Sequence, residues 1–216
     1  MKNKKYIFFD LDGTLTDPGL GITRSVQYAL AHYGIKIDDL KALKCFIGPP
    51  LQDSFRDFYG FDREKAFEAV EKYREYYSQT GIFENELYSG IPELLTALCG
   101  LDKTLVVATS KPTVFAERVL DHFGIRQYFD LVIGSELNGE RTDKSEVIDF
   151  AIKHLSISDV PCIVMIGDRK HDIIGAKKCG IDSIGVLFGY GDMAELESAG
   201  ANLIAATVSE LHQLLV

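Results

Sequence analysis

Two acidic residues follow a short apolar run near the start of the chain. Asp10 comes directly after the run Tyr6–Phe9, and Asp12 follows two residues later, before Gly13. If the run is a strand of an open parallel sheet, Asp10 lies at the carboxyl edge, where such sheets bind ligands. Gly13 permits a tight loop whose amides face an anion, so the two acids could serve one substrate as acid and base. Alone, however, an Asp-Gly pair after a strand is more typical of an Asx turn.

A second acidic pair favours the chemical interpretation. Asp168 and Asp172 follow another apolar run, Cys162–Ile166, so two strands would present carboxylates at the same edge of the sheet. Carboxylate oxygens suit Mg²⁺, which takes one or two of them and fills its remaining positions with water and substrate oxygens. Asp172 could instead cap the following helix, because acids favour that position. That alternative does not account for Asp168.

Hydroxyl and basic side chains follow two further apolar runs. Thr109 and Ser110 precede Pro112, where their hydroxyls and the amides of a starting helix could hold phosphate oxygens, although residues before proline are also ordinary helix caps. Lys144 opens the next helical pattern and could neutralise both a phosphate and the Asp10 carboxylate. A lysine at a helix start is electrostatically unfavourable, so a merely solvated role is less expected here than for most lysines, although it stays open.

Apolar runs typical of buried strands alternate with helical patterns along most of the chain. Such alternation predicts an α/β fold, a Rossmann-like parallel sheet with helices on both faces. The predicted strands are Tyr6–Phe9, Thr104–Ala108, Asp130–Ile133, Cys162–Ile166 and Ser183–Leu187.

The region 18–83 interrupts this alternation. It shows helical periodicity without convincing strands, as in Phe67, Val70, Tyr73 and Tyr77. We therefore expect a helical cap at 18–83, inserted into a core formed by residues 1–17 and 84–216. Pro92, near the first position of a predicted helix, marks the return to the core.

Composition excludes several classes of protein. The 216 residues are 46% hydrophobic, which argues against a disordered chain, and 23 basic against 32 acidic residues give a net charge of −9. This balance opposes binding to nucleic acid polymers or anionic membranes. The apolar run before Asp10 is too short for a secretory signal, and no apolar stretch could span a membrane.

The four cysteines, Cys45, Cys99, Cys162 and Cys179, are scattered and form no CxxC pair. We interpret them as buried free thiols rather than zinc ligands or disulfides, and this indicates a cytoplasmic protein.

The motifs and their order resemble the haloacid dehalogenase superfamily, in its phosphoglycolate phosphatase-like branch. The similarity extends over essentially the whole chain. Its motifs are the acidic stretch Asp10–Asp17, then Thr109–Lys111, then Lys144, and finally Gly167–Asp172. The first and last are specific, whereas the middle two are convincing only through their order. The resemblance implies a Rossmann-like core with a helical cap inserted after the first motif.

The same resemblance implies a mechanism. Asp10 would attack phosphorus and become an aspartyl phosphate. Asp12 would protonate the leaving oxygen and then deprotonate the attacking water. Mg²⁺, held by Asp10, the main-chain carbonyl of Asp12 and Asp168, would offset the substrate's charge together with Lys144. Thr109, Ser110 and Lys144 would bind the phosphoryl group, and Asp172 would order the metal's surroundings or Lys144.

The expected partner is a small phosphorylated metabolite, with no expectation about the oligomeric state. The basic residues after Asp168 and the stretch Gly139–Lys144 are more similar to the 5′-nucleotidase-like group, so phosphoglycolate and a nucleoside 5′-monophosphate are both candidate substrates. Arg24 and Gly48, in the cap, are expected to contribute to substrate choice, although an arginine at such a position is more often simply solvated. Lys111 could bind a second anionic group or remain solvated.

Three other functions stay open. A phosphomutase of the same superfamily would share nearly all of these residues. A phospho-accepting switch also places an aspartate at a strand end beside Mg²⁺, but it needs neither an inserted cap nor an acid such as Asp12. A non-catalytic phosphate-binding protein is the third alternative.

Overall fold

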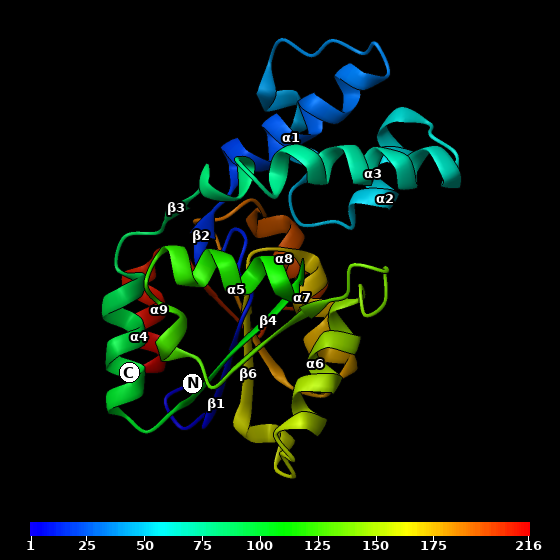
Figure 1. Cartoon of the computed structure of the whole chain (residues 1–216). Helices are drawn as coiled ribbons and strands as arrows, with labels where there is room; N and C mark the ends of the chain where they lie inside the picture. Colours follow the sequence, from blue (N-terminus) through cyan, green and yellow to red (C-terminus); the bar gives the residue numbers. More distant parts are fainter. The chain divides into compact units, whose positions relative to one another are not determined.

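A six-stranded parallel sheet forms the centre of the larger of two units in the computed structural model, which describes residues 1–216 (Figure 1). The strand order is β5-β4-β1-β6-β7-β8, which confirms the predicted α/β fold. Neighbouring strands pair in parallel register, with Phe9 aligned to Val107 on one side and to Ile166 on the other. The strands are β1 (Tyr6–Phe9), β4 (Thr104–Pro112), β5 (Leu131–Ser135), β6 (Ile163–Gly167), β7 (Asp182–Val186) and β8 (Leu203–Ala205).

The strand order has a chemical consequence. From β1 the chain moves outward to β4 and β5, and it then returns to β6 on the other side of β1. A crevice forms at the carboxyl edge where the winding direction of such a sheet reverses. The loops that follow β1, β4 and β6 therefore meet at this edge.

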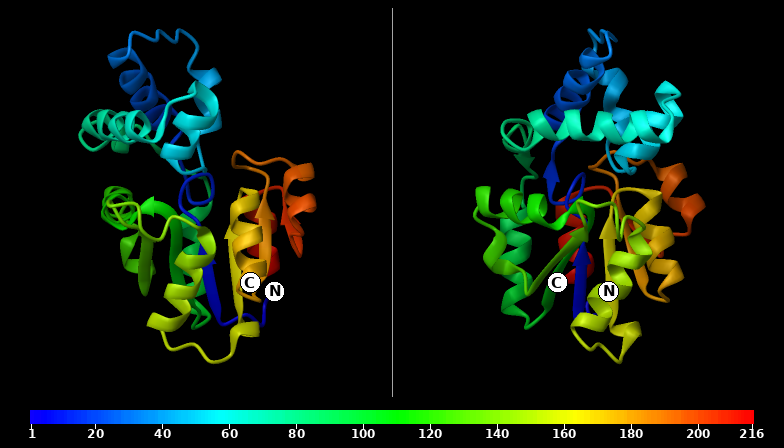
Figure 2. Two further views of the ribbon diagram at one scale, coloured as in Figure 1. Left: turned by 90° about the vertical axis from the view of Figure 1, so that its right-hand side faces the viewer. Right: turned by 45° about the vertical axis from the view of Figure 1, so that its right-hand side comes forward.

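Helices cover both faces of the sheet (Figures 1 and 2). Phe8 and Met165 pack in one hydrophobic cluster with residues of α6 and α7, whereas Ile7 and Phe9 alternate to the opposite face, as the period of a strand requires. All four side chains are buried, which explains why these strands are continuous apolar runs in the sequence. The helices are α4 (Ile91–Gly100), α5 (Thr113–His122), α6 (Lys144–His154), α7 (Lys170–Lys178), α8 (Met193–Ala199) and α9 (Val208–Leu215), with short 3₁₀ turns η3 (Arg126–Tyr128) and η4 (Val160–Cys162).

The second unit, Asp17–Glu86, is helical, whereas Met1–Thr16 and Leu87–Val216 form the sheet unit. Its helices are α1 (Gly19–His32), η1 (Leu40–Phe46), α2 (Leu51–Tyr59), α3 (Arg63–Tyr77) and η2 (Gly81–Phe83). The strands β2 (Thr16–Asp17) and β3 (Glu86–Leu87), where the chain leaves and re-enters the sheet unit, form a two-stranded sheet that the sequence did not predict.

The apolar face of α3 differs by one residue from the predicted pattern. Val70, Tyr73 and Tyr77 are buried, but Phe67 is 50% exposed and Ala66 is buried in its place. The reason is the helical period: Ala66 lies four residues before Val70 and continues the stripe, whereas Phe67 falls at its edge.

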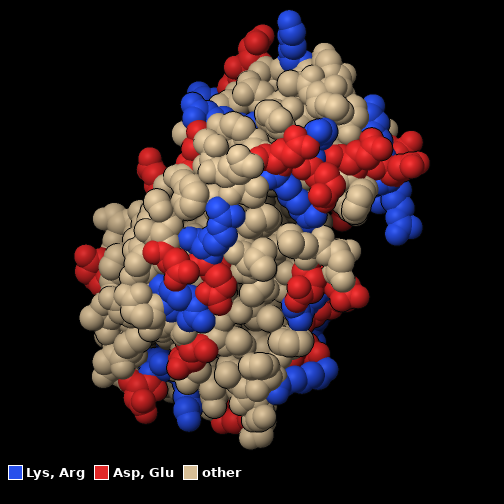
Figure 3. All heavy atoms as spheres, in the orientation of Figure 1, with Lys and Arg blue, Asp and Glu red and all other residues tan.

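The surface carries mixed charges on the face that Figure 3 shows. Acidic side chains form a row along α3, whose glutamates are exposed, and basic side chains lie between other acidic ones. This face offers no continuous basic surface of the kind that nucleic acid binding needs.

All four cysteines are free thiols, as expected, but the expected burial is wrong. Cys45 and Cys99 are exposed, whereas Cys162 and Cys179 are half-buried, with Cys179 packed against the hydrophobic core. In addition, none of the helices combines the length and the apolar character that a membrane crossing demands.

Candidate active site

The loop after β1 fixes the direction of Asp10. The amide of Asp10 donates to the carbonyl of Ile166 (2.8 Å), which extends the β1–β6 pairing by one residue. Its carboxylate Oδ1 accepts from the amide of Leu11 (2.8 Å), and the Leu11 side chain is fully buried. The Asp10 carboxylate is therefore held by backbone at the carboxyl edge of the sheet, and its Oδ2 receives no hydrogen bond from the protein.

Gly13 lets this loop approach the next strand end. Its φ of +81° lies in the left-handed region, and a Cβ at this position would lie 2.2 Å from Asp168 Oδ2. Only glycine fits both the backbone angle and the space. The loop thereby brings Asp168, directly after β6, beside the loop of Asp10.

Three buried carboxylates share this edge of the sheet. Oxygen atoms of Asp10, Asp168 and Asp172 all lie within 4.8 Å of one another. Asp172 is the third residue of α7, and its Oδ2 accepts from the amide of Arg169 (3.1 Å), the residue that caps the helix. Asp172 is therefore not the cap that the alternative interpretation supposed, but its side chain accepts from the amide of that cap, and its other oxygen lies in the carboxylate cluster.

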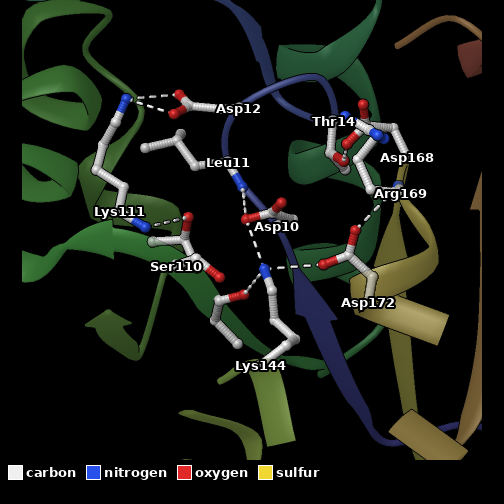
Figure 4. A network of polar contacts seen from close by, with 12 residues as sticks. Asp10, Leu11, Asp12, Thr14, Ser110, Lys111, Lys144, Asp168, Arg169 and Asp172 are labelled. Carbon is white, nitrogen blue, oxygen red and sulfur yellow. Dashed lines mark hydrogen bonds and ion pairs between the residues drawn. The ribbon is translucent and has the colours of Figure 1, made fainter. Parts of the chain in front are cut away.

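Lys144 is the cation of this cluster (Figure 4). Its ammonium lies 2.9 Å from Asp10 Oδ1, 2.8 Å from Asp172 Oδ1 and 3.1 Å from the carbonyl oxygen of Ala108. The ammonium group thus pairs with two carboxylates and donates a hydrogen bond to one carbonyl oxygen. Lys144 begins α6 as predicted, and Gly175 in α7 lets the two helices approach, because a Cβ there would lie 2.9 Å from Lys144 Cγ.

The charges within the cluster do not balance. If all three carboxylates are ionised, they and the ammonium give −3 + 1 = −2 for groups that are almost entirely removed from solvent. Burial, together with repulsion from Asp172 and Asp10, raises the pKa of Asp168 well above its ordinary value. Burial likewise raises the pKa of Asp172 to about 6, against the opposing effect of Lys144. Burial disfavours the charge of Lys144, but Asp10 and Asp172 outweigh it and raise the pKa of this lysine.

A divalent cation fits this arrangement. Buried carboxylates without compensating charge are unfavourable, and hard oxygen ligands are those that Mg²⁺ prefers. Of the ligands that the family resemblance implies, the side chains of Asp10 and Asp168 belong to this cluster, whereas the carboxylate of Asp12 does not. Asp172, bound to Lys144, adds negative charge beside it.

The end of β4 departs from the prediction. The strand continues through Pro112, and α5 begins only at Thr113, so Thr109 and Ser110 lie on the strand end and not at a helix start. Between the pairs Ala108–Ile133 and Pro112–Ser135 the register shifts, so three residues of β4 face Gly134 alone. A Cβ on Gly134 would lie 2.0 Å from the carbonyl oxygen of Lys111, so this bulge depends on glycine.

The bulge determines where the motif side chains lie. Thr109 is buried, and its Oγ1 accepts from the amide of Lys111 (3.2 Å). Ser135 Oγ donates to the carbonyl oxygen of Ser110 (2.8 Å). The ammonium of Lys111 contacts both carboxylate oxygens of Asp12, at 2.7 Å and 2.5 Å, and its side chain is only 6% exposed (Figure 4). The alternative of a solvated Lys111 is therefore wrong, because the bulge directs the side chain inward.

The two cap residues lie within the helical unit. Arg24, on α1, forms an ion pair with Glu84 and remains 45% exposed at its side chain. Gly48 lies between η1 and α2 with φ of +103°, a conformation that favours glycine for backbone reasons alone. Within this unit, therefore, Arg24 is already neutralised, and the conformation of Gly48 has a structural explanation.

Comparison with known proteins identifies the family. Residues 7–186 match the family model for haloacid dehalogenase-like hydrolases. The chain belongs to this family.

Several relatives of this hydrolase carry names. It is 49% identical over 209 residues to a 5′-nucleotidase of Pseudomonas aeruginosa, covering 97% of this chain and 94% of the relative. It is 38% identical over 217 residues to the tyrosine-protein kinase PtkA of Mycobacterium tuberculosis, covering 99% of this chain and 73% of the relative. A phosphoglycolate phosphatase of Colwellia psychrerythraea is 28% identical over 219 residues, with 98% and 96% covered.

The solved structures agree with this assignment. A predicted phosphatase from Clostridium acetobutylicum superposes on this hydrolase with a TM-score of 0.95 and is 48% identical, covering 98% of this chain and 97% of that one. Together with the family match, these comparisons show that the hydrolase is a phosphatase-type enzyme acting on phosphoric monoesters.

The structure of the hydrolase also adds residues that the sequence did not single out. The amide of Tyr190 donates to Asp168 Oδ2 (2.8 Å). A Cβ on Gly189 would lie 2.4 Å from the Cβ of Asp168, and a Cβ on Gly191 would lie 2.0 Å from the carbonyl oxygen of Asp168. The loop after β7 thus encloses Asp168. The pair of glycines around a tyrosine, directly after a predicted strand, was the signal available in the sequence.

Proposed function

We propose that this hydrolase is a Mg²⁺-dependent phosphatase that cleaves a small phosphate monoester through an aspartyl phosphate on Asp10. The observation that carries the proposal is the buried cluster in which Lys144 lies 2.9 Å from Asp10 while three carboxylates lie within 4.8 Å of one another. A carboxylate held this firmly, beside an ammonium group and a site for a dication, is suited to attack an anionic substrate.

In the first half of the reaction, Asp10 attacks phosphorus. The bond from its carboxylate oxygen to phosphorus forms as the bond from phosphorus to the ester oxygen breaks. Asp12 gives a proton to the leaving oxygen, and Lys144 stabilises the phosphoryl charge. Thr109 and Ser110, at the end of β4, bind and orient the phosphoryl group.

In the second half, water attacks the aspartyl phosphate. Asp12 takes a proton from the water, inorganic phosphate leaves and the Asp10 carboxylate is regenerated. Burial raises the pKa of Asp12 despite the nearby Lys111, which brings the carboxyl group closer to the range in which it both donates and accepts protons. The same residue can therefore serve both halves.

The metal would be held by the side chains of Asp10 and Asp168 and by the main-chain carbonyl of Asp12, with Asp172 adding negative charge nearby. Bound there, Mg²⁺ supplies charge neutralisation for the approach of two anions. The −2 imbalance of the cluster supports this assignment. The free thiols agree with a reducing compartment such as the cytoplasm.

For the substrate, we favour a nucleoside 5′-monophosphate over phosphoglycolate. The relative named 5′-nucleotidase is 49% identical, whereas the relative named phosphoglycolate phosphatase is 28% identical. The helical unit with Arg24 and Gly48 is the region expected to select between them. A phosphate-release screen with Mg²⁺ over nucleoside monophosphates, phosphoglycolate and sugar phosphates, with chelated controls, tests this choice.

The catalytic assignment is tested by Asp10→Asn. The variant is expected to lose Mg²⁺-dependent release of p-nitrophenol from p-nitrophenyl phosphate, because an amide is a poor nucleophile. Asp149→Asn is the matched control, since Asp149 is a half-exposed aspartate that pairs with Lys153 on α6 and should leave turnover unchanged. Turnover retained by Asp10→Asn would refute the mechanism.

Phosphoryl transfer to an acceptor other than water is a second candidate. The observation that favours it is the 38% identity to a protein named a tyrosine-protein kinase. The same Asp10 would carry the phosphoryl group, as it would in a phosphomutase. Product analysis of turnover reactions with alcohol, sugar phosphate or tyrosine peptide acceptors distinguishes transfer from hydrolysis. Transfer yields a new phosphate ester, whereas hydrolysis yields inorganic phosphate.

A further inference from the structure

Asp12 is separated from the other acids although it lies only two residues from Asp10. The three carboxylates that could hold a metal ion, here called the cation cluster, are those of Asp10, Asp168 and Asp172, and Asp12 is not among them. Figure 4 shows why: the carboxylate of Asp10 is directed toward Lys144, whereas that of Asp12 extends to the opposite side, toward Lys111. Both Asp12 oxygens contact the Lys111 ammonium, at 2.7 Å and 2.5 Å. Each aspartate of the loop thus has a lysine of its own.

Lys111 is held in this position by the fold. It lies in the β4 bulge, where its carbonyl oxygen approaches Gly134 so closely that no side chain would fit there. Its amide donates to Thr109 Oγ1, and its side chain is buried. Backbone and side chain are both constrained, so the ammonium group is presented to Asp12 at a defined place.

Lys144 cannot replace Lys111 in this role. Its ammonium already forms ion pairs with Asp10 and Asp172 and donates a hydrogen bond to the carbonyl oxygen of Ala108. No other ion pair engages Asp12, whose side chain is only 14% exposed. If the Lys111 ammonium were removed, Asp12 would become a buried carboxylate without a counterion, which is strongly unfavourable.

We propose that Lys111 is a positioning residue that keeps the Asp12 carboxylate out of the cation cluster. This inference rests on the proposed function, in which Asp12 transfers protons. A carboxylate that binds the metal is not free to transfer a proton, so the ion pair with Lys111 preserves the separate role of Asp12. Without the ammonium, the cation beside Asp10 is the strongest charge available to Asp12, and the carboxylate turns toward it.

Binding of the metal alone provides the first test. Titration calorimetry with Mg²⁺, and with Mn²⁺ as a second probe, is carried out without substrate. Lys111→Met should bind the ion about tenfold more tightly, because one more carboxylate reaches it. Lys111→Met combined with Asp12→Asn should return to the affinity of Asp12→Asn alone. Lys111→Arg should behave as wild type, because a guanidinium group can also pair with both oxygens.

The matched control is Lys153→Met, which removes a lysine that is 74% exposed on α6 and should change neither metal affinity nor turnover. If Lys111→Met does not fold, Lys111→Gln serves for the same titration, since it removes the charge but keeps a hydrogen-bond donor. Unchanged or weakened metal binding in the neutral variants, or tighter binding that persists in the double variant, would overturn the inference.

Turnover provides the second readout. In Lys111→Met, kcat for p-nitrophenyl phosphate should fall about 10²-fold because proton transfer is lost, with KM changed far less, and Lys111→Arg should restore most of it. A kcat equal to wild type would contradict the role. The two proposals can fail separately. The proposed phosphatase function is refuted if the wild-type protein releases no phosphate from any ester. The calorimetric comparison of the variants tests the positioning role of Lys111 independently of turnover.

Discussion

The ammonium group of Lys144 lies 2.9 Å from the carboxylate of Asp10, and both groups are almost fully buried. A buried ion pair costs desolvation on both sides, so it is weak evidence of stability by itself. Here the same ammonium also binds Asp172, so it joins β1 to the start of α7. Lys144 therefore holds the cluster together, in addition to the role that we propose for it in the reaction.

Replacing this lysine should affect both stability and activity. Lys144→Met leaves the two carboxylates unpaired in the core, and we expect a loss of about 3–5 kcal/mol in the free energy of unfolding, measured by urea denaturation. Lys178→Met, which removes an exposed lysine paired with Asp143, should cost less than about 1 kcal/mol. Similar losses of unfolding free energy in the two variants would show that the buried ion pairs of Lys144 contribute nothing to stability.

Removing a cluster carboxylate should have opposite effects with and without metal. Asp168→Asn relieves repulsion in the chelated protein, so its melting temperature is expected to rise there. Wild-type protein should gain about 2.7 kcal/mol from Mg²⁺ at a hundredfold excess over its Kd, and the variant should gain almost nothing. Thermal unfolding with EDTA and with Mg²⁺ measures both effects. An equal Mg²⁺ response in variant and wild type would place the ion elsewhere.

The raised pKa of Asp172 predicts the pH dependence of the metal-free protein. Burial raises this pKa to about 6 from an ordinary value of 3.8, so the folded state binds the proton more tightly than the unfolded state. Stability contributed by this group is therefore lost as pH rises from about 4 to about 6. Urea midpoints over this range in EDTA should fall more steeply in wild type than in Asp172→Asn. Parallel curves would contradict the assignment.

Two glycines with similar positive φ angles allow backbone strain to be distinguished from contact with the site. Gly13 and Gly34 both have positive φ, +81° and +74°, but a Cβ on Gly34 meets nothing within 4 Å. Gly34→Ala should cost only the backbone strain, about 1 kcal/mol. Gly13→Ala displaces Asp168 as well, so it should cost more and weaken Mg²⁺ binding about tenfold, measured by calorimetry. Equal effects on metal binding would show that Gly13 matters through its backbone alone.

Much of the architecture was predictable from local patterns. The run Tyr6–Phe9 is the strand β1 with the predicted bounds, and Lys144 begins a helix as predicted. Strands buried on both faces must be continuous apolar runs, and polar residues that follow them must lie at the carboxyl edge. By contrast, the short strand β8 was missed, because Leu203 at its start is partly exposed and its pattern is too brief to recognise.

The sequence by itself determined which residues are candidates for the chemistry, because acid, hydroxyl and lysine side chains at strand and helix ends are visible as types and spacings. Only the tertiary structure decided how these groups are paired. The β4 bulge opposite Gly134 directs Lys111 to Asp12, and the loop after β7 encloses Asp168. Such pairings join segments about 20 to 150 residues apart, and they depend on glycines packed so closely that an added Cβ would lie only 2 to 3 Å from the neighbouring segment, which no local pattern encodes.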